Sequence, residues 1–142
     1  MNETDFLLEK IYNRTQKASK TLGMLLTSVE NKSLRRDIIS QITEYDKINK
    51  EAGEAICEIG KQPQKNISVK ERVNVWGMSL AASTNPSCGN VAKIISAESG
   101  KGVIEIVGAM NNCVNSTPSA YSLARKLVSR EENGINKMKP YL

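Results

Sequence analysis

Apolar residues recur at spacings of three and four along most of this chain, and that period predicts amphipathic α-helices. The pattern predicts four long helices, over about 5–29, 34–59, 87–112 and 118–139, and a shorter helix over about 69–83. Turns of only a few residues join the first long helix to the second and the third to the fourth, which favours antiparallel neighbours. We therefore predict one all-α domain over residues 1–142, a four-helix bundle.

Residues that commonly begin or end helices mark most of these boundaries. We expect Asn2 or Thr4 to cap the first helix and Gly60 to end the second. Asn85-Pro86 and Thr117-Pro118 each place a capping side chain before a proline at the first helical position. Pro140 should stop the last helix. In the third helix, Gly100, Gly102 and Gly108 are interpreted as points where a neighbouring helix approaches closely.

Two glutamates lie inside apolar stripes and are the strongest hint of chemistry. Glu98 belongs to the stripe of the third long helix and Glu131 to that of the last. A turn near Asn115 sets a register that places these carboxylates opposite each other inside the bundle. Burying two carboxylates is costly, so we expect either a shared proton or hydrogen bonds from Tyr45, Thr15 or a lysine.

Other polar residues near the predicted core have simpler interpretations. Glu44 and Glu51 border the apolar face of the second helix, where pairing with lysine or solvation is favoured over metal ligation. Thr15 lies in the stripe of the first helix, where its hydroxyl can bond to a carbonyl one turn back. If the protein does bind a metal, the candidate ligands are Glu98, Glu131, Glu44 and Glu51, with Tyr45 and Thr15 as buried polar neighbours.

Composition excludes several classes of function. The 142 residues contain no histidine, which excludes imidazole-based catalysis and the usual zinc and haem sites. Three scattered cysteines without a paired motif, and no apolar run of membrane length, favour a soluble cytoplasmic protein. The net charge of +5 permits weak attraction to nucleic acid, but no basic run interleaves with aromatic residues, so a solvated helical surface is preferred.

The chain also resembles a group of uncharacterised bacterial ferritin-like proteins. The segments that carry this resemblance are 44–52, 97–100, 102–106, 131–133 and 137–139. The resemblance implies an up-down-down-up bundle with the short helix in the crossover between the second and third long helices. Ferritin-like di-iron sites use glutamates with two Glu-x-x-His motifs. Here Thr15, Lys47 and Gly134 stand where ligands would be expected, so the resemblance implies a degenerate metal centre.

These observations leave two main functional hypotheses open, and whether the protein is an enzyme is not decided. The preferred one is a structural or protein-interaction module that has lost its metal centre, needs no cofactor and forms a homodimer or larger homo-oligomer or binds another protein. The alternative is a carboxylate-only metal-binding or oxidative-stress protein that uses iron or manganese. Weak, non-specific nucleic-acid binding is a third and less favoured option.

Overall fold

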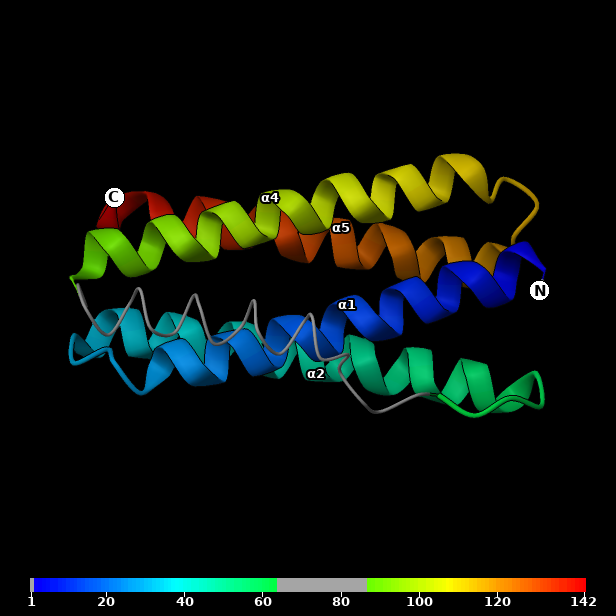
Figure 1. The fold of residues 1–142 in the computed structure, drawn as a ribbon, viewed down its shortest axis with the longest axis horizontal. Coiled ribbons are helices and arrows are strands. Elements are labelled where there is room, and N and C mark those ends of the chain that lie inside the picture. The colour runs from blue at the N-terminus through cyan, green and yellow to red at the C-terminus, as the bar shows by residue number, and fades with distance from the viewer. Residues whose placement is uncertain (1, 64–86) are drawn as a thin grey trace.

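The computed structural model describes residues 2–63 and 87–142 of the chain (Figure 1). Its elements are α1 (Glu3–Leu26), α2 (Lys32–Glu58), α4 (Cys88–Asn112), α5 (Pro118–Met138) and a 3₁₀ turn, η1 (Lys139–Tyr141). The described residues contain no strand, so the prediction of an all-α fold with four long helices is confirmed for them. The helix expected over 69–83 lies outside the described residues.

The helices associate as two hairpins. α1 packs most extensively against α2, and α4 packs most extensively against α5. Fewer contacts, between α1 and α4, between α2 and α5 and between α1 and α5, join the hairpins into one bundle. Figure 1 shows the N-terminus and C-terminus at opposite ends of this bundle.

Capping side chains account for the helix starts. Asn2 accepts a hydrogen bond from the Asp5 amide at 2.8 Å, so Asn2 caps α1. Thr117 caps α5, as expected, with Pro118 as its first helical residue. The expectation that Asn85 caps α4 is wrong, because α4 begins at Cys88 and Ser87 accepts from the Asn90 amide at 3.2 Å.

The helix ends also follow local hydrogen bonding. α1 stops at Leu26, three residues before its expected end, because the Ser28 and Val29 amides bond to the Leu25 and Leu26 carbonyls in a tight turn. After α2, Gly60 adopts a left-handed backbone with φ of 80°, which glycine accommodates without the steric cost of a Cβ. This agrees with the prediction that Gly60 ends that helix.

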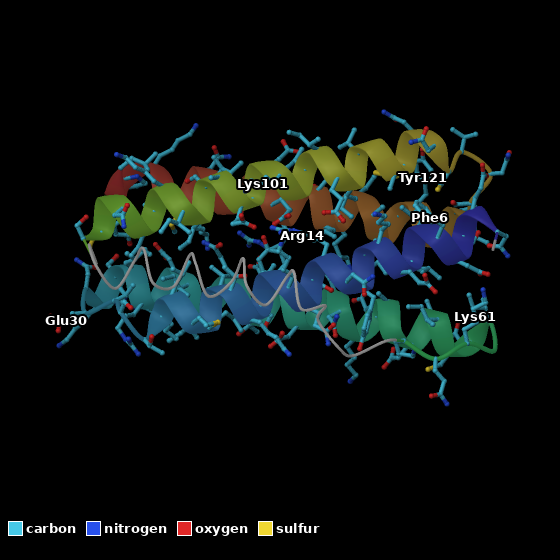
Figure 2. All side chains as sticks on the ribbon, viewed as in Figure 1. Phe6, Arg14, Glu30, Lys61, Lys101 and Tyr121 are labelled. Atoms are coloured by element: carbon cyan, nitrogen blue, oxygen red, sulfur yellow. The ribbon has the colours of Figure 1, made fainter. Side chains whose placement is uncertain are left out.

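The core consists of aliphatic side chains from all four long helices, with a polar layer at mid-length. Fully buried apolar residues include Leu7, Ile38, Ile106 and Leu127. Figure 2 shows Arg14 near the middle of the bundle, between Glu30 at one end and Lys61 at the other. The polar layer is the natural place to look for function, because buried ionic groups must be compensated by specific partners.

Candidate functional site

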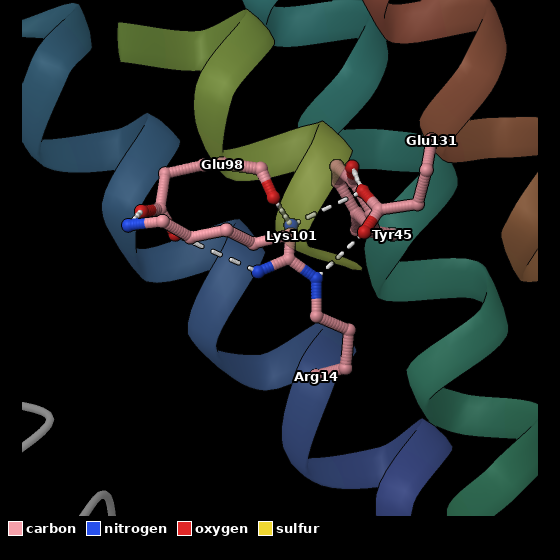
Figure 3. A network of polar contacts seen from close by, with 5 residues as sticks. All are labelled: Arg14, Tyr45, Glu98, Lys101 and Glu131. Atoms are coloured by element: carbon pink, nitrogen blue, oxygen red, sulfur yellow. Dashed lines mark hydrogen bonds and ion pairs between the residues drawn. The ribbon is translucent and has the colours of Figure 1, made fainter. Parts of the chain in front are cut away.

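Four helices each contribute one side chain to a buried ionic network (Figure 3). The members are Arg14 from α1, Tyr45 from α2, Glu98 from α4 and Glu131 from α5. Lys101, also on α4, joins the network from the solvent side. The network therefore links both hairpins at one level of the bundle.

The Arg14 guanidinium lies between the two glutamates. Its Nε donates to Glu131 Oε2 at 2.6 Å and its Nη2 to Glu131 Oε1 at 3.2 Å. The same Nη2 also donates to the Glu98 main-chain carbonyl at 3.0 Å, and Nη1 lies 3.8 Å from Glu98 Oε2. The Arg14 and Glu131 side chains are 3% and 0% exposed, so this is a buried, two-point ion pair.

Each glutamate has one more partner. The Tyr45 hydroxyl donates to Glu131 Oε1. Lys101 Nζ lies 3.2 Å from Glu98 Oε1, and the lysine side chain is 73% exposed. Glu131 is thus held entirely inside the bundle, whereas Glu98 connects the interior to solvent.

A glycine makes room for the ion pair. A Cβ at Gly102 would overlap Glu131 Oε2 and lie 2.6 Å from Arg14 Nε. A Cβ at Gly100 or Gly108 would meet nothing within 4 Å. The close-approach interpretation therefore holds for Gly102, although side chains and not a helix backbone fill the space. Within the described chain nothing approaches Gly100 or Gly108 in this way.

Burial and ion pairing act in opposite directions on Glu131. Desolvation by burial raises its pKa above the ordinary value of 4.5, and the charge and hydrogen bond of Arg14 partly offset this. The net pKa is raised, which favours the protonated form in the folded state relative to the unfolded chain. Burial is therefore the leading cause of the raised pKa of Glu131.

The other candidate residues lie apart from this network. Glu44, at the edge of the bundle, pairs with the buried Arg130, and Glu51 pairs with Lys126 at 3.1 Å at the bundle surface. Thr15 donates to the Ile11 carbonyl at 2.9 Å, one turn back along α1, as expected for a self-satisfied threonine. Among the described residues, no group of three or more Cys, Asp and Glu side chains is arranged to hold a metal ion. Assignment of these carboxylates to a metal remains a prediction.

Arg14 is the residue that sequence reasoning missed. The sequence offers Tyr45, Thr15 or a lysine as the donors to the buried glutamates, and the apolar stripe it predicts on the first helix contains Thr15 and not Arg14. A second stripe, Leu7, Ile11, Arg14 and Ala18, has the same spacing of three and four and is buried. That alternative stripe is the signal by which Arg14 could have been found.

A second buried arginine extends the polar layer towards the opposite surface. The Arg130 guanidinium lies 5.9 Å from the centre of the Tyr45 ring, and burial lowers the pKa of Arg130. A Cβ at Gly134 would lie 3.2 Å from Arg130 Nη2, 3.2 Å from Gln41 Oε1 and 3.3 Å from Ser99 Oγ. Gly134, which replaces the expected histidine, therefore borders a polar region filled by other side chains.

Comparisons with known proteins identify the fold and nothing more specific. No family model matches the chain, and no curated protein matches it. A solved structure of a DUF305 fragment from Deinococcus radiodurans is similar, with a TM-score of 0.75 at 14% sequence identity. The match covers 99% of this chain and 95% of that one. In the described part of the chain, no helix combines the length and apolarity needed to cross a membrane.

The space at Gly102 gives a matched pair of substitutions. Gly102→Ala should lower the free energy of unfolding by about 2 kcal/mol, because the added methyl group displaces the Arg14–Glu131 pair. Gly23→Ala, in α1 where an added Cβ would also meet nothing within 4 Å, should raise it by about 0.5–1 kcal/mol through helix propensity. Urea denaturation of both variants measures the difference. Equal effects of the two substitutions would contradict the close approach at Gly102.

The ion pair predicts that substitutions of Arg14 and of Glu131 lower the free energy of unfolding by different amounts. Arg14→Met leaves the Glu131 carboxylate without a cation and should lower the free energy of unfolding by about 3 kcal/mol at pH 7. Glu131→Gln should cost less, because Arg14 keeps the Glu98 carbonyl and carboxylate and the amide oxygen still accepts from Tyr45. The double variant Arg14→Met, Glu131→Gln should regain most of the stability that Arg14→Met alone loses. Arg36→Met, at an exposed position on α2, is the control and should change stability by under about 0.5 kcal/mol.

The raised pKa of Glu131 fixes the sign of the pH dependence of these variants. The stability contributed by the protonated form is complete below the ordinary value of 4.5 and is lost as pH rises through the raised folded value. The cost of Arg14→Met should therefore shrink between pH 7 and pH 4, and Glu131→Gln should abolish this part of the pH slope. A loss of stability on acidification that depends on Glu131 would contradict the assigned direction.

Proposed function

We propose that this protein is a ferritin-like, up-down-down-up helical bundle that acts as a self-associating structural or interaction module, without a working di-iron centre. The course of the helices in Figure 1 supports the topology, since α1 and α5 run one way and α2 and α4 the other. The similarity to the DUF305 fragment supports a shared fold at the level of a helical bundle.

The observation that carries this proposal is the position of Arg14. In a di-iron bundle, carboxylates converge on metal ions in the core. Here the guanidinium lies between Glu98 and Glu131: it supplies positive charge to both carboxylates and two hydrogen bonds to that of Glu131. A permanent protein cation at that place repels a metal ion and occupies the carboxylate oxygens that would bind it.

The alternative, a carboxylate-only metal site, is tested directly by elemental analysis. Protein purified after iron or manganese supplementation should contain less than about a tenth of an equivalent of metal, because carboxylates without imidazole make a weak site for either ion. The Glu98→Gln, Glu131→Gln double variant is the control for adventitious metal. One equivalent in the wild type that disappears in this variant would overturn the proposal in favour of the metal-binding alternative.

The outer face of α4 supports self-association. Ile104 is 76% exposed, the most exposed of the large apolar side chains in the described residues, and Val107 beside it is also exposed. Gly100 and Gly108 lie one turn before and one turn after Ile104, with open space above both. The result is an apolar ridge between two shallow positions, a shape that fits a similar ridge on a second helix.

A second copy of the same chain matches this face under two-fold symmetry. An antiparallel contact centred on Ile104 places Gly100 of one copy at the level of Gly108 of the other. The same operation brings Lys101 near the level of the other copy's Glu105, on the same flank of the contact. Both side chains are substantially exposed, so each dimer would contain two ion pairs between Lys101 of one copy and Glu105 of the other.

Sedimentation velocity over a range of protein concentrations tests this interface. Wild-type protein should show concentration-dependent mass, and Ile104→Lys should be monomeric, because a lysine at the two-fold axis meets the same charge on its partner. Ile39→Lys, at an apolar α2 position of 48% exposure, is the matched control and should associate as wild type does. A wild type that stays monomeric throughout, or equal association of both variants, would overturn the assignment of the α4 face.

A further inference from the structure

Next to the ionic network, between α1, α2 and α4, lies a cavity of about 10 Å³. Its polar lining includes Thr21, Gln41 and Ser99 together with the network residues Arg14, Tyr45 and Glu98. The rest of the lining is aliphatic, from Ala18, Leu22, Leu25 and Ile95. A cavity of this volume is about the minimum that one water molecule requires.

Two side chains that line the cavity have buried polar atoms without a hydrogen-bond partner in the described part of the protein. Gln41 is 0% exposed, and neither its Oε1 nor its Nε2 has a partner. Thr21 is 5% exposed, and its Oγ1 has none. A buried polar group left unpaired costs about 1–3 kcal/mol. Three buried polar atoms without a hydrogen-bond partner, beside one small cavity, therefore indicate that the cavity holds a ligand.

The charges around the cavity decide what kind of ligand fits. The charged lining residues, Arg14 and Glu98, are already paired within the network described above. The unsatisfied groups are a neutral amide and a neutral hydroxyl, which together offer donors and acceptors. An ion would add uncompensated charge to a buried and balanced site. A neutral molecule that both donates and accepts, and is no larger than water, fits the size of the cavity and the neutral groups of Gln41 and Thr21.

We propose that this cavity is a binding site for a single buried water molecule, held by Gln41 of α2 and Thr21 of α1. The water accepts from Gln41 Nε2 and donates to Thr21 Oγ1, and so bridges the two helices of the first hairpin. Such waters commonly make about three hydrogen bonds and are costly to remove. The site is independent of the proposed function and of the α4 face.

Arg130 offers Gln41 a competing partner. Arg130 Nη2 also lacks a partner, and it lies on the same side of Gly134 as Gln41 Oε1. If Gln41 turned towards Arg130, its Oε1 would accept from Arg130 without water, while Gln41 Nε2 and Thr21 Oγ1 would stay unpaired. The two arrangements predict opposite effects of removing the Thr21 hydroxyl, which makes that substitution the decisive one.

Thr21→Val keeps the shape of the side chain and removes its hydroxyl. With a bridging water, the variant should raise the equilibrium constant for unfolding about fivefold, the value of one hydrogen bond. With a dry cavity, the variant removes an unsatisfied buried group and the constant should stay level or fall. Thr21→Ser, which keeps the hydroxyl, should retain the water.

Magnetic relaxation dispersion of ¹⁷O counts the long-lived internal water molecules in the same proteins. Wild type and Thr21→Ser should each show one more such water than Thr21→Val. Thr43→Val, at an exposed position whose hydroxyl donates to the Ile39 carbonyl of its own helix, should match wild type. Equal counts in wild type and Thr21→Val, or an unfolding constant that does not rise in Thr21→Val, would overturn the proposal.

Discussion

The buried pair between Arg14 and Glu131 is the interaction on which the centre of this bundle depends. Removing two charges from water costs several kcal/mol for each ion, and pairing compensates only when the geometry is good and the remaining hydrogen-bonding groups are satisfied. Here Glu131 accepts from two guanidinium nitrogens and from Tyr45, while Arg14 also reaches the Glu98 carbonyl. One residue from each long helix is needed to meet these demands, so the pair fixes the level at which the two hairpins meet.

This requirement explains why the helices cannot slide past one another freely. Aliphatic stripes tolerate a shift along the helix axis, because one leucine packs much like another. A shift of one turn would separate Arg14 from Glu131 and bring a Cβ-bearing residue to the place of Gly102. Asn49 adds a similar restraint within the first hairpin, where its amide donates to Tyr12 and Thr15 of α1 at 3.0 Å. Polar contacts therefore specify the register that apolar packing alone leaves loose.

Sequence reasoning recovered the periodic features and missed the partner of the buried charge. Helix number and several caps follow from local spacing, which the chain displays directly. The opposition of Glu98 and Glu131 followed from the length of a single turn. Arg14 was missed because α1 carries two overlapping stripes, and an arginine is by default assigned to the solvent side. Choosing between the stripes requires knowing which face of α1 meets the other hairpin, and that is a tertiary fact.

The glycines of α4 connect the interior of the bundle with its outer surface. Each glycine within a helix costs about 0.5–1 kcal/mol relative to alanine, and α4 contains four of them, so this helix needs compensation. At Gly102 the compensation is visible, because the space holds the carboxylate and guanidinium of the ion pair. Gly100 and Gly108 have no such neighbour within the chain, yet both flank the highly exposed Ile104. In the self-association proposed above for the α4 face, a second copy of the chain would fill the space over these two positions.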